Sequence, residues 1–483
     1  MFGEPNPLLD LVPMFNDPKD LHAALTHNPL KDVDVSKLNF MQKKILLATP
    51  QVMLKPTTQT LMAALTWYSM MVGSLSNRNP LRAENRRLYW EALNADPNRD
   101  KPFEKPLLTG ISANVFKGPA GTGKTVTYQH FSNCFQQVIE HGRNDAAGWV
   151  SIKQLVYFHV DMSHDGSRKG FLTAILMKLD SLLGTDYGTT LPRAHKTVET
   201  LAVATIQRLL AHFTGIIFID EIQLRNLVKN SSADLMQTFL LSLINSGIPI
   251  VLTGNERAMD WVSYSQDITR LLITNPIHAH PIGALDEPGW EADWNAMCDR
   301  GVMRFYLLDE PVANPAACSE MLYRCSGGVA RLAHSLWTQA QSHCLITAKP
   351  MVAPEDIEAV FNSIHYDSIR NFVNGFHFKN ADLLTLYPDV DSNFYRRHWQ
   401  PSLMPSDSHI DTITAVEPPT TKKKPPRTLS EQSKFKSQET RKKTTQAHAA
   451  HLKRTLSPDD MRREGHVQNN LNQLMKLKDA AES

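Results

Sequence analysis

Apolar residues alternate between short runs and longer, helically spaced segments, mainly from residue 107 to residue 285. The short runs are rich in β-branched and aromatic residues, which favour strands, and cover 112–117, 155–160, 215–223 and 248–255. The segments between them place apolar residues on one side of a helix and cover 126–140, 171–183, 198–213 and 235–244. Because strands that alternate with helices form parallel sheets, the pattern predicts an α/β fold of three layers.

The chain on either side of this core has a different pattern. Residues 1–105 begin irregularly with several prolines and continue with two segments of helical character, 55–72 and 80–93. This N-terminal extension either docks a partner through its apolar anchors or forms a structural layer around the core. Residues 106–285 are the predicted nucleotide-binding core, and residues 286–375 are predicted to form a helical lid.

Residues 376–483 are predicted to be a basic, largely disordered tail. Seven prolines fall between residues 388 and 426, and the polar residues around them offer too little apolar surface to offset the entropy of ordering. Between 420 and 463 there are 13 Lys/Arg and 4 Asp/Glu, a local charge of +9. Ser457 starts a terminal helix whose narrow apolar stripe would gain order on a partner. The alternative is a tail that only improves solubility.

Composition narrows the class of protein further. The 483 residues carry a net charge of +2, so the body without the basic stretch is mildly acidic. Five scattered cysteines form no C-x-x-C pair and indicate buried thiols in a reducing compartment. The first ten residues do not resemble a signal peptide, and the apolar stretch 61–72 is too short to span a bilayer. We therefore expect a cytoplasmic protein without a membrane partner.

A glycine-rich turn follows the first predicted strand and leads into a helix. Its sequence at 118–125, GPAGTGKT, matches a P-loop, in which backbone N–H groups and a helix N-terminus surround the phosphates of a nucleotide. Lys124 would reach the β- and γ-phosphates of ATP, and Thr125 would ligate Mg²⁺. The predicted nucleotide-binding residues of this segment are Gly118, Pro119, Ala120, Gly121, Thr122, Gly123, Lys124, Thr125 and Val126.

Two acids end the most apolar predicted strand, 215–223. Asp220 lies where the carboxyl ends of parallel strands place ligands, and we expect it to hold Mg²⁺ as a Walker-B aspartate does. Glu221 is the predicted group that polarises the attacking water. An acid pair at this position favours ATP hydrolysis over phosphoryl transfer to another substrate.

Three further residues are candidates for the same reaction. Asn255, after the next strand, is a candidate for contact with the attacking water or the γ-phosphate, with Thr253 as its competitor. Arg331 opens a predicted lid helix and is expected to bind the nucleotide, although it could be a surface cation. Arg270 lies where a neighbouring subunit could receive an arginine finger.

Several segments together resemble TnsC, the AAA+ regulator of bacterial cut-and-paste transposons, and the related TniB proteins. The resemblance covers most of residues 75–375, and its most discriminating part is the segment DMSHDGS at 161–167. It is also carried by the P-loop, the strand end IDEIQ at 219–223, PIVLTG at 249–254, NRNP at 77–80 and SGGV at 326–329. The tail matches only in being a long appendage.

The resemblance implies an ATP-dependent ATPase that assembles on duplex DNA as a ring or helical filament. It would connect a target selector of the TnsD/TniQ type to transposase subunits of the TnsA/TnsB type, which we expect the C-terminal tail to bind. In a bacterium such a protein is cytoplasmic and associated with the nucleoid. A helicase loader or replication initiator would share every Walker feature, and an ATP-binding scaffold without turnover is a second alternative.

The loop after the second core strand is the predicted DNA contact. It combines hydroxyl groups, a glycine and two adjacent cations, which are the groups that bind phosphates without reading sequence. The residues are Ser163, His164, Ser167, Arg168 and Lys169. The alternative is a solvated turn in which Asp165 cancels part of the charge.

Overall fold

The computed structural model describes residues 4–49, 55–98, 113–162, 167–222, 233–258, 260 and 276–400. The chain divides into two compact units, 1–405 and 406–483, and all described residues belong to the first. The predicted terminal helix from Ser457 lies outside the described residues. None of the helices in the described ranges combines the length and the apolar character needed to cross a bilayer.

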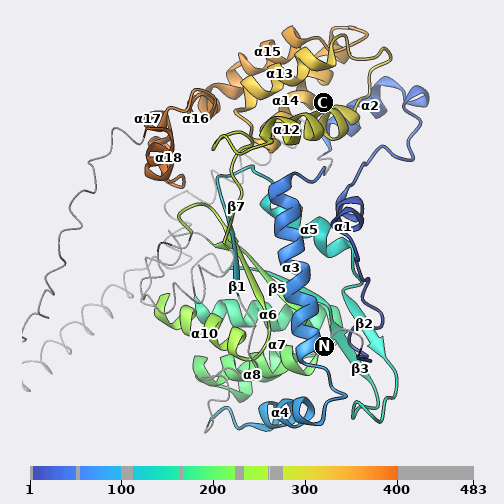
Figure 1. Cartoon of the computed structure of the whole chain (residues 1–483), viewed down its shortest axis with the longest axis vertical. Helices are drawn as coiled ribbons and strands as arrows, with labels where there is room; N and C mark the ends of the chain where they lie inside the picture. Colours follow the sequence, from blue (N-terminus) through green and yellow to red (C-terminus); the bar gives the residue numbers. More distant parts are fainter. Residues whose placement is uncertain are drawn as a thin grey trace, which may run out of the picture. The chain divides into compact units, whose positions relative to one another are not determined.

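A five-stranded parallel sheet forms the centre of the molecule (Figure 1). Its strands lie in the order β4 (Tyr157–Asp161), β5 (Ile216–Ile222), β6 (Ile250–Gly254), β1 (Ala113–Lys117) and β7 (Ile277–His278). The order places β6 between the P-loop strand β1 and strand β5, which carries Asp220. The prediction of an α/β fold with a parallel sheet is confirmed, whereas β7 was not predicted.

Side chains alternate between the two faces of this sheet, and each face is covered by helices. On one face, Val115, Ile217, Ile219 and Leu252 belong to a hydrophobic cluster with three helices. These helices are α6 (Arg168–Leu183), α8 (Val198–Ala211) and α10 (Ala233–Asn245). The short helix α7 (Tyr187–Ala194) joins α6 to α8. Three of the four helices predicted for the core therefore form one outer layer.

The opposite face is covered by α3 (Thr58–Asn77) and α5 (Lys124–Asn133). Trp67 of α3 is fully buried, and its ring packs edge-on against Phe116, Phe131 and Phe218 at centroid distances of 5.3, 5.7 and 5.3 Å. The indole Nε1–H donates to Oδ1 of Asn114 on β1, at 2.7 Å. Of the two interpretations of the N-terminal region, these contacts favour a structural layer for α3.

The other N-terminal elements contact both the sheet layer and the lid. They are α1 (Pro18–Leu25), the 3₁₀ turn η1 (Val35–Lys37), α2 (Phe40–Ala48) and α4 (Ala83–Asn94). Leu21 and Leu25 of α1 join the cluster around Trp67. Lys43 of α2 forms an ion pair with Asp309 at 2.6 Å. The N-terminal region is therefore packed on the rest of the chain.

Residues 290–377 are mainly helical. The elements are α12 (Trp290–Arg300), η3 (Val302–Arg304), α13 (Pro315–Ser326), α14 (Ala330–Ile346), α15 (Pro354–Phe361), η4 (Ile364–Ile369) and α16 (Arg370–His377). Four of the five cysteines are buried here as free thiols, namely Cys298, Cys318, Cys325 and Cys344, and Cys134 is half-buried. These are the helices that the sequence predicted for the lid, and they share one hydrophobic cluster.

Two segments differ from their predicted secondary structure. The helix predicted over 126–140 ends at Asn133, and β2 (Val138–His141) follows, paired antiparallel with β3 (Ile152–Leu155). The β-branched pair Val138 and Ile139 favours a strand, and burial of Ile139 in the core overrides the helical spacing. The apolar run 155–160, predicted as one strand, is likewise divided between β3 and β4.

The prediction of a largely disordered tail from residue 376 onward is wrong for residues 376–400. The helices α17 (Ala381–Leu384) and α18 (Ser392–Trp399) fold in this part of the chain. Tyr395 is fully buried, and the indole of Trp399 donates to the carbonyl oxygen of Ala284 at 2.7 Å. Two large aromatic side chains thus supply the apolar surface that the proline-rich composition concealed.

Candidate nucleotide site

The P-loop turn connects β1 to α5, and two of its glycines are required by its geometry. A Cβ atom at position 118 would lie 2.2 Å from the carbonyl oxygen of Ala279, so only glycine fits where the turn passes β7. Gly123 has φ of +92° and caps α5, a conformation that residues with a side chain rarely adopt. The helix begins directly after it, at Lys124, so its free N–H groups face the turn.

Lys124 folds back over the turn. Its Nζ donates to the carbonyl oxygens of Gly118 and Pro119, both at 2.8 Å. Desolvation lowers the pKa of Lys124 from its usual 10.5 to about 8, and the charges of Asp220, Glu256 and Asp389 act in the opposite direction. A buried ammonium bonded only to carbonyl groups can exchange them for the stronger acceptors of a triphosphate.

Asp220 is held by four hydrogen bonds. Its Oδ2 accepts from the hydroxyl groups of Thr125 at 2.9 Å and Tyr128 at 2.8 Å. Its Oδ1 accepts from the Thr253 hydroxyl and from the backbone N–H of Glu221, the latter at 2.8 Å. These contacts fix the carboxylate beside the first turn of α5. Thr125 and Asp220, both oxygen ligands, are the residues that fit Mg²⁺.

Thr253 and Asn255, at the end of β6, are the two candidates for contact with the attacking water or the γ-phosphate. Thr253 is fully buried and bonded to Asp220, so it positions the Walker-B carboxylate. Asn255 follows the strand and is half-buried, and among the described residues no group donates to its buried Oδ1. An unpaired buried acceptor is unfavourable unless a ligand or water donates to it. Asn255 is therefore the better placed of the two to contact a water molecule or a phosphate.

Glu221 lies next to Asp220 but is exposed, unlike its buried neighbour. Its backbone φ is +57°, a left-handed conformation that is uncommon for a residue other than glycine. The register between β5 and β6 also shifts between Ile219 and Ile222. The irregularity interrupts the regular ladder at Glu221, and such local strain is typical of functional positions.

The lid meets the P-loop at Gly121. The backbone N–H of Arg331 in α14 donates to the carbonyl oxygen of Gly121 at 3.0 Å. The Arg331 side chain is exposed and borders a cavity of about 600 Å³, large enough for a nucleotide. The walls of this cavity come from the P-loop, the lid and the N-terminal region.

The N-terminal wall of the cavity was missed from the sequence. Lys55, Thr57, Gln59 and Thr60 border it, opposite the P-loop residues 121–127. Burial lowers the pKa of Lys55, and the charge of Arg300 lowers it further. The cavity therefore has three cationic side chains on its walls, those of Lys55, Lys124 and Arg331, which suits a polyanion.

A buried polar cluster lies beyond Asn255. Glu256 accepts hydrogen bonds from the Tyr395 hydroxyl and from the backbone N–H of Asp391, the latter at 2.7 Å. Nδ1 of His280 lies 3.1 Å from the same hydroxyl. Desolvation raises the pKa of Glu256 from 4.5 to about 7, and burial lowers the pKa of His280 to about 3. The cluster joins α18 to the segment after β6.

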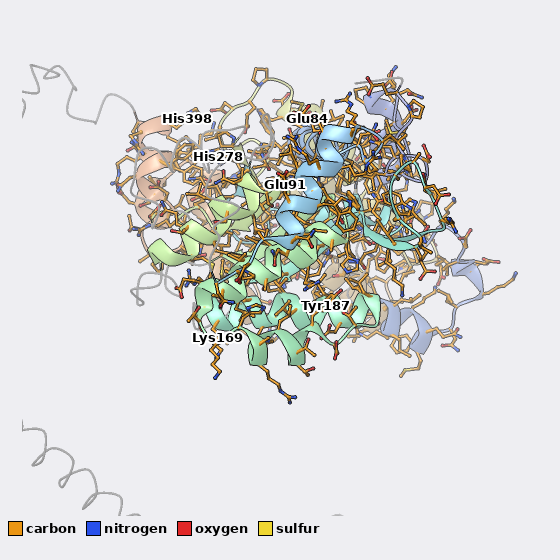
Figure 2. The ribbon with its side chains drawn as sticks, turned by 90° about the horizontal axis from the view of Figure 1, so that it is seen from below. Glu84, Glu91, Lys169, Tyr187, His278 and His398 are labelled. Atoms are coloured by element: carbon orange, nitrogen blue, oxygen red, sulfur yellow. The ribbon has the colours of Figure 1, made fainter. Side chains whose placement is uncertain are left out.

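The predicted DNA loop is described only at its end. Ser167 caps α6 through a 3.2 Å bond from the N–H of Gly170. Arg168 is buried and forms an ion pair with Glu199, so its position favours a structural role over the predicted contact with DNA. Lys169 is exposed and extends from the surface (Figure 2). Ser163, His164 and the predicted finger Arg270 lie outside the described residues.

Residues 112–262 match a family model described as an AAA domain. This part of the chain is an AAA domain. The matched residues include the P-loop, Asp220, Glu221 and Asn255, and they exclude Arg331 and the lid. With its Walker residues assembled at one edge of the sheet, the AAA domain makes the protein an ATPase.

Three solved structures show low similarity to this chain. The Aeropyrum pernix ORC1 protein in complex with DNA is 18% identical over 65% of this chain and 75% of that chain, with a TM-score of 0.36. Drosophila ORC bound to DNA is 12% identical over 82% and 83%, with a TM-score of 0.38. A single-residue variant of Thermotoga maritima RuvB is 13% identical over 67% and 87%, with a TM-score of 0.31. No curated protein matched the chain.

Tyr128 is the functional residue of the AAA domain that the sequence did not suggest. It lies one helical turn after Thr125, and both hydroxyl groups point to Asp220. A polar aromatic residue three positions after the P-loop threonine was the available signal. Desolvation and the Asp220 charge both raise the pKa of Tyr128, so its hydroxyl remains a donor.

Proposed function

We propose that this ATPase binds duplex DNA in an ATP-dependent manner, assembles on it, and regulates transposition by linking a target selector to a transposase. The dependence of DNA binding on ATP is supported by a contact between the start of the predicted DNA loop and the nucleotide site. The backbone N–H of Met162 donates to the carbonyl oxygen of Asp220 at 2.9 Å. The loop therefore begins beside Asp220, the residue that we assign to Mg²⁺, so we expect changes at the nucleotide to reach it through this contact.

In this proposal, Lys124 and the P-loop N–H groups hold the triphosphate. Thr125 and Asp220 hold Mg²⁺, which neutralises phosphate charge when bound. Asn255 and Glu221 orient the attacking water, because hydrolysis requires a positioned nucleophile. Arg331 contacts the nucleotide from the lid, and Arg270 completes the site of a neighbouring subunit. ATP between subunits thus favours assembly, and hydrolysis favours release.

The DNA contact is proposed for Ser163, His164, Ser167 and Lys169, whose hydroxyl, imidazole and ammonium groups suit phosphates. In a ring or filament these loops repeat along the duplex and grip it without reading its sequence. Contacts to several phosphates release counterions, so affinity would fall steeply with salt concentration. The support for duplex DNA is the chemistry of these residues and the resemblance of the segment 161–167.

The partners proposed from the TnsC resemblance are a TnsD/TniQ-type target selector and TnsA/TnsB-type transposase subunits. The terminal stripe of Val467, Leu471, Leu474 and Leu477 is the proposed transposase contact. Removal of residues 457–483 should abolish transposase recruitment while ATPase activity and DNA binding persist. We place the protein in the bacterial cytoplasm, at the nucleoid.

The deciding experiment images the full chain with duplex DNA in ATP and in ADP. We expect rings or filaments with ATP and their loss with ADP. The Glu221→Gln variant should bind ATP, fail to hydrolyse it and remain on DNA, whereas Lys124→Ala should not assemble. Assembly by Lys124→Ala, or a Glu221→Gln variant that behaves as the wild type, would contradict the proposal.

A second assay separates transposition from helicase loading, because both activities use the same Walker residues. The ATP-bound assembly is incubated with purified transposase or with a replicative helicase, and retention on DNA is measured. We expect retention of the transposase alone. Retention of the helicase alone would identify a loader and contradict the transposition proposal, while the ATPase assignment would stand.

A further inference from the structure

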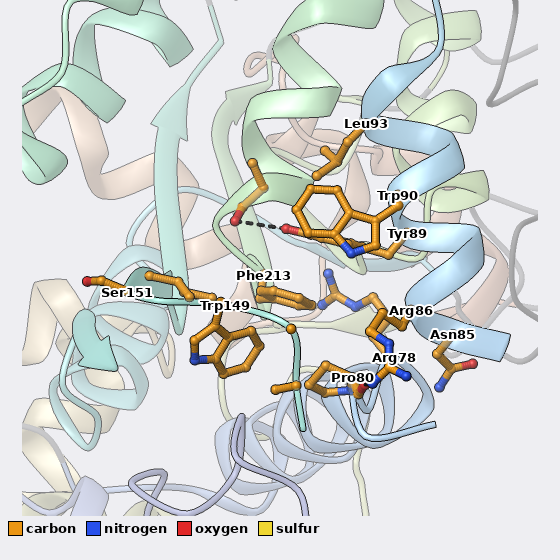
Figure 3. A pocket seen from close by; sticks show the side chains of 14 residues that line it. Arg78, Pro80, Asn85, Arg86, Tyr89, Trp90, Leu93, Trp149, Ser151 and Phe213 are labelled. Carbon is orange, nitrogen blue, oxygen red and sulfur yellow. Dashed lines mark hydrogen bonds between the residues drawn. The ribbon is translucent and has the colours of Figure 1, made fainter. Parts of the chain in front are cut away.

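A second cavity lies away from the nucleotide site. It has a volume of about 240 Å³ and is bordered by α4, the β2–β3 connection and the segment that precedes β5 (Figure 3). Phe213, in its wall, lies before the start of β5, whereas Asp220 lies near the end of that strand. The cavity therefore opens at the amino end of the strands, and the nucleotide site lies at their carboxyl end.

Four aromatic side chains border the cavity, those of Tyr89, Trp90, Trp149 and Phe213. The Tyr89 ring stacks on Phe213 with centroids 4.5 Å apart, and the Trp149 ring meets Phe213 edge-on at 5.7 Å. The Tyr89 hydroxyl is bonded to the carbonyl oxygen of Ala211 at 3.1 Å, which fixes the ring (Figure 3). Trp90 is 46% exposed at the rim. A fixed aromatic wall beside an exposed tryptophan is typical of a binding surface.

Two arginines border the cavity without an acidic partner. The guanidinium of Arg78 is buried and donates to Ser74 and to the carbonyl oxygen of Thr214, while its Nη1 has no acceptor among the described residues. Burial lowers the pKa of Arg78 only to about 10, so it stays charged at neutral pH. Arg86 donates to the carbonyl oxygens of Ala146 and Pro80.

The cavity is bordered by two arginines and, among the described residues, by no Asp or Glu, so its charge is positive. None of the residues that border the cavity is acidic, and in the described part of the chain neither arginine forms an ion pair. A buried cation without a counter-ion is unfavourable, and an anion brought to the cavity would relieve that cost. The surface therefore favours an acidic ligand.

The small volume of the cavity favours a single side chain over a nucleotide as its occupant. Cavities for compact organic ligands usually measure about 300–1,000 Å³, and this one, at about 240 Å³, is smaller. A shallow hollow continues from it along the outer face of α4, bordered by Ala83, Arg86, Arg87, Trp90, Glu91 and Asn94. A mainly apolar cavity that continues into a shallow groove with two arginines and one glutamate matches an extended peptide with one large anchor.

We propose that this surface, which we call the α4 pocket, binds an acidic peptide segment of a partner protein. An aromatic or large aliphatic side chain of the peptide enters the cavity against Tyr89 and Phe213. Flanking carboxylates of the peptide pair with Arg86 and lie in the field of Arg78. The inference is independent of the proposed role in transposition, since it rests on α4 and its neighbours alone.

The test is selection of random heptapeptides displayed on phage against the immobilised full chain, followed by fluorescence anisotropy of the enriched peptides. We expect sequences that combine one large apolar residue with Asp or Glu. The variants Trp90→Ala and Arg86→Gln should each weaken binding about tenfold. Arg324→Gln is the matched control, because Arg324 lies on α13, borders neither the cavity nor the hollow, and pairs with Glu358.

Three outcomes would overturn the proposal. No enrichment means that the cavity is structural or filled by this chain itself. Enriched peptides that lack Asp and Glu would contradict the proposed pairing with Arg86. Peptides that bind Trp90→Ala and Arg86→Gln as tightly as the wild type would contradict binding in the α4 pocket. Displacement of the peptides by equimolar duplex DNA identifies a nucleic-acid surface instead. ATPase activity of each variant, expected to be unchanged, verifies that the chain is folded.

Discussion

The Tyr128 hydroxyl lies 2.8 Å from Oδ2 of Asp220, the oxygen that also accepts a hydrogen bond from Thr125. The two donors come from the same side of α5, one turn apart. If Thr125 moves to a metal ion, Tyr128 keeps the carboxylate in place. Tyr128 is therefore a positioning residue for the Walker-B aspartate.

Removal of that hydroxyl should weaken catalysis without unfolding the chain. A hydrogen bond to a charged group contributes about 1.5–3 kcal/mol, so Tyr128→Phe should lower kcat/KM for ATP by roughly ten- to a hundredfold. The matched control is Tyr157→Phe, because no side-chain bond of the Tyr157 hydroxyl is found among the described residues. Steady-state hydrolysis at saturating Mg²⁺ measures both. Equal activity of the two variants would exclude this role for Tyr128.

The pKa of Lys124 predicts a proton linkage in ATP binding. Because desolvation lowers this pKa to about 8, part of the free protein carries a neutral Lys124 at pH 9. Binding of the triphosphate restores the ammonium and takes up a proton. The Kd for ATP should therefore rise by up to about tenfold per pH unit above pH 8. Calorimetry in buffers of different ionisation enthalpy measures the proton uptake.

Lys124→Arg supplies the control, since a guanidinium stays charged up to about pH 12. Its Kd for ATP should be independent of pH between 8 and 10. The same lysine affects stability: its pKa is lower in the folded chain, so the unfolded chain binds more protons between pH 8 and 10.5. The free energy of unfolding should thus rise with pH in that window for the wild type and stay flat for the variant.

Glu256 predicts the opposite dependence in a different window. Desolvation raises its pKa from 4.5 to about 7, so the folded chain binds the extra proton between these values. The stabilisation is complete below pH 4.5 and is lost as the pH rises through 7, by on the order of 3 kcal/mol. Urea unfolding at several pH values should show this loss for the wild type. Glu256→Gln, which cannot ionise, should lack it.

Trp67 tests whether α3 belongs to the core. The side chain is fully buried and contacts three aromatic rings, so Trp67→Ala should destabilise the folded chain by about 3–5 kcal/mol. Phe378→Ala removes an aromatic side chain that is 68% exposed and should change the free energy by no more than about 0.5 kcal/mol. Chemical denaturation compares the two. If the two variants lost similar free energies of unfolding, α3 would not be part of the core, and the interpretation of α3 as a partner-docking helix would be favoured.

Site residues that belong to short contiguous motifs were predictable from the sequence. Contacts between residues that lie far apart in the sequence were not. Lys124, Thr125, Asp220 and Glu221 belong to contiguous motifs after apolar runs, so local pattern places them at strand ends. The Glu256–Tyr395 contact joins residues 139 positions apart and has no local signature. Similarly, Lys55 reaches the cavity only because α2 and α3 pack on two different parts of the chain.

The errors in secondary structure have local causes. The segment 126–140 has apolar residues at helical spacing, but its β-branched pair at 138–139 lies opposite β3 and adopts its partner's conformation. The segment 388–400 has a composition typical of disorder, yet the contacts of Tyr395 and Trp399 are enough to seat α18. In both cases tertiary contacts determined the local structure against the preference indicated by the spacing or composition of the segment.

The packing of α18 also connects the end of the described chain to Asn255. The backbone leaves the described residues at Gln400, one position after Trp399 and five after Tyr395, whose hydroxyl holds Glu256. Glu256 is the direct neighbour of Asn255. We therefore expect a shift of α18 to move Asn255 through Tyr395 and Glu256, which would couple the packing of this helix to the rate of ATP hydrolysis.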